Sequence, residues 1–144
     1  MIKVLHLSTP KSWRGGEQQL AYLLKYLPDD IENSVLCPGD SILFEYCRVH
    51  GHQCDALSTG PAWKRASKLR AYCRKNGIQL IHTHDSKAHT LAFLGILFFR
   101  MKIPLVVSRR VDFKSGRNIL SKKKYNHPLI KKIICVSDAI KDIM

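Results

Sequence analysis

Two adjacent glycines stand between a strand-like and a helix-like segment near the start of the chain. Gly15 and Gly16 follow the apolar run 2–7 and precede a helical pattern that continues to Leu27. Because glycine has no Cβ, the backbone there can approach a ligand closely, and the helix N-terminus adds N–H groups and partial positive charge. Phosphate is the ligand that such a turn suits. The same turn is needed to enter a helix that binds nothing, so the glycine pair alone leaves both interpretations open.

Two histidines form the second group of reactive side chains. His82 and His84 are two residues apart on a predicted strand and point to the same face, a geometry that can hold a metal ion. The signature of dinuclear metallohydrolases is absent, because Ser86 and Lys87 stand where it requires an aspartate and a further histidine. We therefore predict no metal site. His82 is expected to be a hydrogen-bonded core histidine, and Asp85 or Ser86 is expected to cap the next helix. His84 is assigned to a ligand, as a hydrogen-bond donor or as a positive charge beside an anion.

Two arginines follow the fifth apolar run. Arg109 and Arg110 would lie next to the histidine loop, and the guanidinium group suits bidentate recognition of phosphate or carboxylate. A solvated basic loop is the alternative interpretation. The lysine run 122–124 and the basic segment 62–76 are interpreted in the same way, as charged and solvent-exposed helix faces.

The overall charge favours anionic partners without choosing among them. Lys and Arg number 24 against 11 Asp and Glu, which gives a formal charge of +13. Nucleic acid, phosphorylated small molecules and an acidic membrane surface all fit that charge. Nucleic-acid binding is disfavoured, because aromatic residues are few, none interleave with the basic clusters in an RNA-recognition pattern, and no zinc-finger or helix-turn-helix pattern occurs. The chain also lacks a nucleophile elbow, a Walker lysine motif and an early Gly-x-Gly-x-x-Gly turn.

The reactive residues fall between elements that alternate as strand and helix. A chain of 144 residues that is 45% hydrophobic is the size of one ordinary domain. Strands are predicted at Lys3–Leu7, Ser34–Cys37, Gln53–Leu57, Leu80–Thr83, Leu105–Ser108 and Ile133–Val136. Helices are predicted at Gly16–Leu27, Ile42–His50, Ala62–Asn76, Ser86–Arg100 and Ile119–Tyr125, with one more starting at Ser137.

This alternation predicts an α/β fold. Strands that read as continuous apolar runs, separated by helices, indicate a doubly wound, Rossmann-like parallel sheet of about six strands with helices on both faces. Gly77 ends the third helix with a residue suited to the left-handed conformation. In such a sheet, ligands bind at the carboxyl ends of the strands where the strand order reverses. The loops that carry Gly15, His84 and Arg109 all follow strands and should meet there.

Other features of the chain concern its location. Five cysteines without C-x-x-C spacing predict reduced, mostly buried thiols of a cytoplasmic protein. The strand pattern begins at the N-terminus, with no long apolar stretch behind a charged leader, so a secretory signal is not expected. The apolar run Leu91–Phe99 is too short for a bilayer, which needs about 20 residues. The last helix has no stop signal before Met144, so the sequence looks cut.

Four ordered segments resemble the N-terminal domain of GT-B glycosyltransferases of family 4. They are Gly15–Gln18 after a strand and a long loop, Leu80–Ala88, Pro104–Arg110 and Lys132–Ser137. The resemblance covers essentially the whole chain. It implies that residues 1–144 form one Rossmann-like N-terminal domain that mainly holds the acceptor. It also implies a C-terminal domain for the sugar nucleotide, and no part of this chain matches that domain.

The resemblance also implies roles for individual residues. Gly15 and Gly16 would approach the donor diphosphate, and His84 would lie at the reaction centre as the catalytic residue. Arg109 and Arg110 fall where acceptor contacts occur, and Lys87 would reach an anionic acceptor. Transfer in this family retains the anomeric configuration and usually needs no metal or other cofactor, because positive groups and helix dipoles stabilise the departing diphosphate.

The main stabilising groups of such enzymes belong to the C-terminal half, so the isolated chain is expected to be inactive. The resemblance implies a nucleotide-sugar and a glycan or lipid-linked acceptor as partners, with peripheral contact at the cytoplasmic face of a membrane. The open cleft wall would favour self-association. The alternative hypothesis is a non-catalytic basic α/β module that binds nucleotides or anionic polymers, with salt-dependent affinity.

Overall fold

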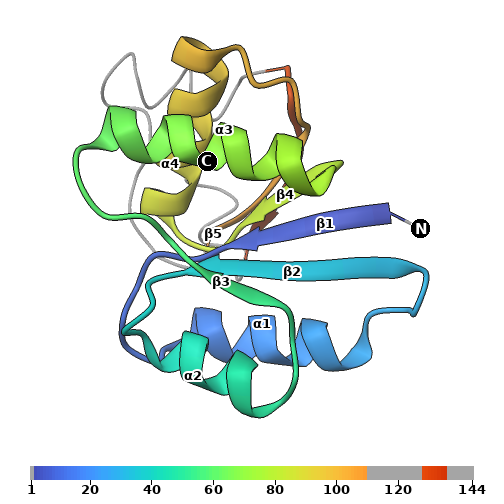
Figure 1. The fold of residues 1–144 in the computed structure, drawn as a ribbon. Coiled ribbons are helices and arrows are strands. Elements are labelled where there is room, and N and C mark those ends of the chain that lie inside the picture. Colours follow the sequence, from blue (N-terminus) through green and yellow to red (C-terminus); the bar gives the residue numbers. More distant parts are fainter. Residues whose placement is uncertain (1, 110–127, 136–144) are drawn as a thin grey trace.

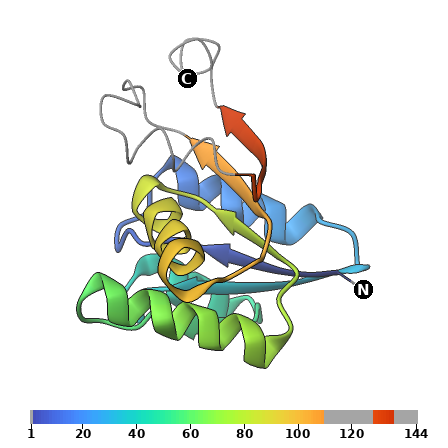
Figure 2. The ribbon, with the colours of Figure 1, turned by 90° about the horizontal axis from the view of Figure 1, so that it is seen from above.

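Six short apolar runs form one parallel sheet in the computed structural model, which describes residues 2–109 and 128–135. The spatial order is β3-β2-β1-β4-β5-β6, with β6 at one edge (Figure 2). This order confirms the predicted Rossmann-like, doubly wound sheet, and it reverses direction between β1 and β4. The strands are β1 (Ile2–Leu7), β2 (Ile31–Cys37), β3 (Cys54–Ala56), β4 (Leu80–Thr83), β5 (Leu105–Arg109) and β6 (Ile130–Cys135).

The described helices form one layer on each face of the sheet. The helices α1 (Gly15–Tyr26) and α2 (Ile42–Val49) cover one face, and α3 (Ala62–Asn76) and α4 (Ser86–Phe99) cover the other (Figure 1). Right-handed crossovers explain this division, because the chain moves one way from β1 to β3 and the opposite way from β3 to β5. The predicted helices on both faces are therefore confirmed.

Alternation along β1 divides its side chains between the two layers. Leu5 and Leu7 are buried in the cluster formed with α3 and α4. On β2, Val35 belongs to the cluster formed with α1 and α2, and it pairs directly with His6 across the two strands. Since neighbouring residues in a strand face opposite ways, His6 lies on the α1 side of the sheet. A polar residue thus occupies a central, buried strand position.

The element boundaries mostly agree with the sequence, and the largest differences occur in two strands. β2 begins at Ile31, three residues before the predicted start, because Ile31 to Asn33 pair with the first residues of β1. β6 begins at Ile130 where Ile133 was predicted, since Ile130 pairs with Leu105 across the sheet. Pairing with a neighbouring strand therefore extends segments whose polar residues hide the strand pattern.

Several predicted features fall outside the described residues. These are the helix Ile119–Tyr125, the helix from Ser137 and the lysine run 122–124. Cys37, Cys47 and Cys73 are buried free thiols and Cys54 is a half-buried one, as predicted. Within residues 2–109 and 128–135, none of the helices combines the length and the apolar character that a membrane span requires.

Gly77 gives a first test of the fold. It ends α3 with φ of 64°, as its sequence position predicted. A Cβ there would meet only the Lys3 side chain, at 3.8 Å, so the cost of Gly77→Ala is the left-handed backbone itself. We expect the free energy of unfolding to fall by about 1 kcal/mol. Urea denaturation measures this loss, and Gly77→Asn, which tolerates that conformation, should lose less. Equal losses in both variants would contradict this explanation.

Candidate functional site

The candidate site lies at the carboxyl ends of β1 and β4, where the strand order reverses. The two strands pair in parallel with His6 opposite His82, and the His84 N–H donates to the Leu7 carbonyl at 3.0 Å. The loop after β1 and the start of α4 are therefore held side by side. This is the place where an open parallel sheet binds ligands.

Asp85 joins the two loops at this edge. Its carboxylate caps α4 by accepting from the Ala88 N–H at 3.2 Å, which confirms it as the predicted helix cap. The same carboxylate accepts from the Thr9 N–H at 3.0 Å and from the Thr9 hydroxyl. A single side chain thus fixes the loop after β1 relative to the N-terminus of α4.

The glycine pair lies at the start of α1. Arg14 precedes the helix, and its N–H donates to the Glu17 carboxylate at 2.8 Å, with Glu17 buried in the first turn. The N–H groups of a first helical turn have no acceptor within the helix, so Gly15 and Gly16 present theirs at this end. A Cβ at Gly15 would meet nothing within 4 Å. Open space of this kind is what a closely approaching ligand requires.

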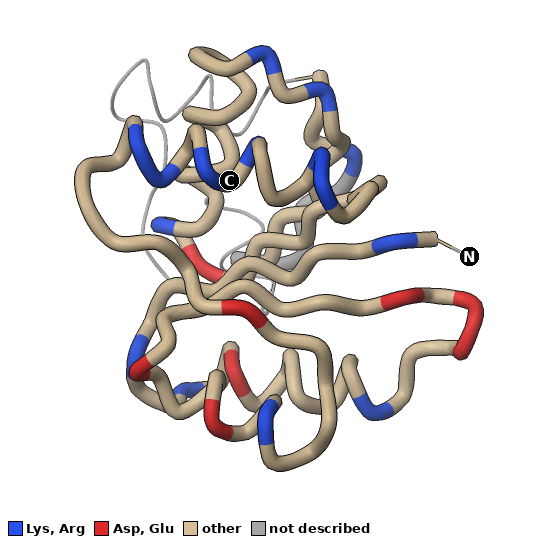
Figure 3. Tube along the Cα trace, viewed as in Figure 1, with Lys and Arg blue, Asp and Glu red and all other residues tan. Residues whose placement is uncertain are grey.

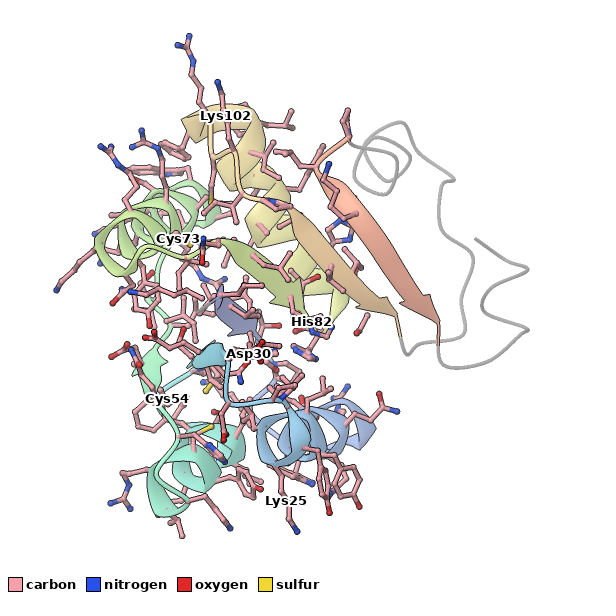
Figure 4. All side chains as sticks on the ribbon, turned by 90° about the vertical axis from the view of Figure 1, so that its right-hand side faces the viewer. Lys25, Asp30, Cys54, Cys73, His82 and Lys102 are labelled. Atoms are coloured by element: carbon pink, nitrogen blue, oxygen red, sulfur yellow. The ribbon has the colours of Figure 1, made fainter. Side chains whose placement is uncertain are left out.

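A row of hydrogen-bonded polar side chains crosses the face of the sheet beneath α1. His6 Nε2 lies 2.9 Å from Asn33 Oδ1, and His6 Nδ1 lies 3.0 Å from His84 Nε2. His82 Nε2 lies 2.6 Å from the Ser108 hydroxyl, which confirms the expected hydrogen-bonded core histidine. The rings of His82 and His84 are 3.9 Å apart, centroid to centroid. Figure 4 shows His82 between the sheet and α1.

The acceptor at one end of the row fixes where the protons lie. Asn33 Oδ1 can only accept, so His6 Nε2 carries a hydrogen and donates. Burial lowers the pKa of His6 to about 4, with the hydrogen bond to Asn33 opposing the shift, so the ring is neutral at pH 7. A neutral His6 has a lone pair on Nδ1, and this nitrogen accepts from His84 Nε2–H. The row therefore orients the imidazole of His84.

A groove opens beside this row. It has a volume of about 440 Å³ and lies between α1 and the side chains of β4 and β5. Most of its wall is apolar, while His82 and Ser108 supply polar groups at its floor. Its lining residues are Gln19, Tyr22, Leu23, Tyr26, Leu27, His82 and Ser108.

The structure brings most of the predicted site residues to one edge of the sheet. Gly15 and Gly16 start α1, His84 follows β4, and Lys87 is exposed in the first turn of α4. His84 differs from the expectation of an open ligand contact in being only 4% exposed. The backbone of Arg109 ends β5 at the same edge of the sheet. Its neighbour Arg110 lies outside the described residues.

Sequence reasoning missed His6 and Asn33. Each interrupts a strand at a position whose side chain faces the α1 layer. His6 contacts His84, which the sequence had singled out, and Asn33 contacts His6. A signal was present, because a histidine between Leu5 and Leu7 places a polar ring on the opposite face from two core leucines. Its significance depended on knowing that β1 lies beside β4.

Comparison with known proteins shows the same fold over the whole chain. The family described as Glycosyltransferase Family 4 matches residues 13–144. The crystal structure of HepE from Anabaena in complex with UDP superposes with a TM-score of 0.79 at 16% identity, over 99% of this chain and 40% of that one. A second HepE crystal structure, in complex with UDP-glucose, gives a TM-score of 0.79 at 17% identity with the same coverage.

Two further solved structures have a similar fold. A glycosyltransferase from Rickettsia africae gives a TM-score of 0.68 at 15% identity, over 98% of this chain and 38% of that one. MurG from Acinetobacter baumannii gives a TM-score of 0.68 at 9% identity, over 94% of this chain and 41% of that one. The chain thus spans about 40% of the length of the solved structures it matches. A search of curated protein sequences finds no match.

Replacing Asp85 tests the link between the two loops. Asp85→Ala removes the helix cap and both acceptors of Thr9, so we expect the free energy of unfolding to fall by about 2 kcal/mol. Thr9→Val keeps the backbone hydrogen bond and should lose about half as much. Urea denaturation measures both losses. An Asp85→Ala variant as stable as the wild type would show that the carboxylate does not hold the loops.

The neutral state of His6 predicts a pH dependence of stability. Because its pKa in the folded chain is about 4 and its unfolded value is near 6.5, the unfolded chain takes up the proton first as the pH falls. The stabilisation is complete above pH 6.5 and is lost as the pH falls towards 4. Between pH 7 and pH 4.5 we expect His6 to account for a loss of about 2 kcal/mol in the free energy of unfolding.

The control for this measurement is His6→Gln, which removes the titrating group and keeps a polar side chain. Urea denaturation of both proteins at the two pH values, in a buffer containing a chelator, separates His6 from the carboxylates. The loss in the wild type should exceed the loss in the variant by the stated amount. Parallel losses would mean that His6 is not held neutral.

Proposed function

Because the chain belongs to glycosyltransferase family 4, we propose that it forms the acceptor-side domain of a retaining enzyme that transfers a hexose or related sugar. The donor is a nucleotide-sugar, and the acceptor is a glycan or a lipid-linked glycan. The observation that carries the proposal is the site at the strand-order reversal, where the glycine turn, His84 and Lys87 share one edge of the sheet.

The start of α1 is proposed to receive the donor diphosphate. Gly15 leaves space at a helix N-terminus, whose N–H groups and partial positive charge suit a phosphate. HepE, whose fold this chain shares, was crystallised with UDP and with UDP-glucose. A uridine diphosphate sugar is therefore a reasonable first probe for this chain.

The remaining roles follow the positions of the residues around that turn. His84 is proposed as the catalytic residue that positions the sugar and the acceptor at the reaction centre. Lys87, Arg109 and Arg110 are proposed to bind the acceptor. Departure of the diphosphate is proposed to need no metal ion or other cofactor, because positive groups and helix dipoles stabilise it.

A second domain is proposed to complete the enzyme. The solved structures that this chain resembles are about two and a half times longer, which leaves room for a donor-binding half. The isolated chain is then proposed to be inactive in transfer. The cleft wall that a second domain would cover is proposed to support self-association of the chain.

Cytoplasmic location with peripheral membrane contact is proposed from the distribution of charge. Figure 3 shows Lys and Arg gathered along α3 in the layer that also holds α4, while Asp and Glu lie mostly around α1 and α2. Large apolar side chains are exposed in the basic layer, with Trp63 66% and Phe98 70% exposed. Cations beside exposed aromatic rings suit an anionic membrane surface that carries a lipid-linked acceptor.

The same basic layer supports a second candidate function, a non-catalytic module for nucleotides or anionic polymers. The formal charge of +13 is the observation that favours it. Binding of this kind would follow the charge and would weaken steeply with salt. Nucleic acid is the less favoured polymer, because the aromatic residues do not interleave with the basic clusters in an RNA-recognition pattern.

UDP-glucose binding tests the first candidate. We expect amide chemical shifts of the chain to change around Gly15, Gly16 and His84 when UDP-glucose is added at 150 mM NaCl. Gly15→Ala should weaken this binding at least fivefold and leave the fold intact, because the added methyl group meets only open space. Shifts confined to α3, or none at all, would contradict the proposed donor site.

Two matched lysines separate the candidate functions. Lys87 and Lys64 are both exposed in the first turn of a helix, at the start of α4 and of α3. Replacing either by Ala removes one positive charge. Heparin affinity, measured at several salt concentrations, should fall equally in the two variants if charge alone determines binding. UDP-glucose or acceptor-glycan binding that weakens at least threefold in Lys87→Ala only would support a defined site.

A further inference from the structure

Three buried imidazoles meet on the α1 side of the sheet. His82 and His84 come from one strand and its end, and His6 comes from the neighbouring strand, directly opposite His82. One ring nitrogen from each lies within 4.8 Å of the others. All three side chains are nearly excluded from solvent. The two strands thus supply three nitrogen ligands from a rigid part of the fold.

In two of these rings, one nitrogen is hydrogen-bonded to an oxygen atom outside the histidine cluster. We call it the outer nitrogen. His6 Nε2 bonds to Asn33 Oδ1 and His82 Nε2 bonds to the Ser108 hydroxyl, at 2.9 and 2.6 Å. Histidines that bind metal ions almost always use their second ring nitrogen in this way, which fixes the tautomer and aims the first nitrogen. In His6 the first nitrogen, Nδ1, points to His84. The arrangement therefore includes both the ligand nitrogens of a metal site and the hydrogen bonds that orient their rings.

We propose that His6, His82 and His84 bind a divalent transition-metal ion, with Zn²⁺ the first choice. Three imidazoles with one open position form the ligand set of a zinc site of the carbonic anhydrase type. Neutral imidazole prefers Zn²⁺, Co²⁺, Ni²⁺ or Cu²⁺, whereas Mg²⁺ and Ca²⁺ require oxygen ligands. The groove beside α1 reaches this cluster, because His82 lines it together with Ser108.

Metal binding requires only small movements. Without an ion, a hydrogen joins His6 Nδ1 and His84 Nε2 at 3.0 Å. An ion with bonds of about 2.0–2.1 Å in tetrahedral geometry separates its ligand nitrogens by about 3.3 Å. Binding therefore replaces the hydrogen bond by two metal bonds. His84 Nε2 releases its hydrogen to solvent and His84 Nδ1 takes one up, so the ring stays a neutral ligand. The rings of His82 and His84 must also move apart, because their centroids are 3.9 Å from each other.

The proposed metal site does not rest on sugar transfer. Zn²⁺ binding is measured on the chain alone, by metal content and by spectroscopy, whereas UDP-glucose binding is measured at the glycine turn. Either can fail while the other holds. An ion at this site replaces the prediction, made from the spacing of His82 and His84, that the chain binds no metal.

The test uses the chain prepared without a polyhistidine tag and stripped with a chelator. After excess Zn²⁺ is added to the stripped chain, we expect one equivalent to remain bound through desalting. Co²⁺ should give the strong visible absorption bands of a four-coordinate ion with nitrogen ligands. His82→Gln should lose the bound equivalent while circular dichroism shows an unchanged fold. A native chain that retains no stoichiometric Zn²⁺ would overturn the proposal.

Two variants decide the case if His82→Gln fails to fold. Ser108→Ala and Asn33→Ala leave all three ligands in place and remove only the oxygen that holds an outer nitrogen. Each should weaken Zn²⁺ affinity by about 10–100-fold. The carboxylate of Asn33→Asp can accept the same hydrogen bond, so this variant should have the Zn²⁺ affinity that Asn33→Ala loses. Wild-type affinity in both alanine variants would contradict the site.

A matched control removes histidines elsewhere. His50 and His52 lie near the surface with their rings 6.4 Å apart, and such a pair can bind Zn²⁺ adventitiously. The double variant His50→Gln, His52→Gln should keep the bound equivalent and the Co²⁺ bands. Loss of the metal from this variant would place binding at the surface pair and overturn the proposed site.

Discussion

The adjacency of β1 and β4 is the constraint on which the site depends. Residues 6 and 82 are distant in the sequence, yet they are direct partners across the two strands. The strand order reverses between them, so the helices that follow these two strands lie on opposite faces of the sheet. Thr9 and Asp85 then join the two loops by hydrogen bonds. The glycine turn and the start of α4 consequently lie at the same edge of the sheet, although they belong to helices on opposite faces.

The polar row beneath α1 is the second consequence of this adjacency. Burying polar groups is costly unless each finds a partner, and a central strand offers few partners of its own. Asn33, Ser108 and the three histidines meet this requirement together, because four adjacent strands bring them to one face. Each member depends on its neighbours, so a change at Asn33 reaches His84 through His6. A buried polar network of this kind is rigid only while every member has its partner.

The sequence predicted the layers better than it predicted the site. Apolar runs and turn residues such as Gly77 located ten elements, because local periodicity and backbone conformation act within a few residues. Strand order is determined by the packing of the whole chain, so the contact of His6 with His84 was not visible in either segment alone. The sequence assigned His84 to a ligand, and it gave no sign that the structure buries the His84 ring. The side chain of Arg109 and all of Arg110 fall outside the described residues, and their roles stay predictions.

Burial also bears on how His84 can act in sugar transfer. The sequence left two roles open, a hydrogen-bond donor or a positive charge beside an anion. A charged imidazole loses hydration when it is buried, and His84 is only 4% exposed. Its Nε2–H already donates to a neutral neighbour, a contact that requires no charge on the ring. These two facts favour the neutral role. Positive charge for a diphosphate must then come from exposed groups such as Lys87 and from the N-terminus of α1, which lie at the same edge. The charged groups then lie where water and substrate reach them, and the buried histidines orient one another through hydrogen bonds.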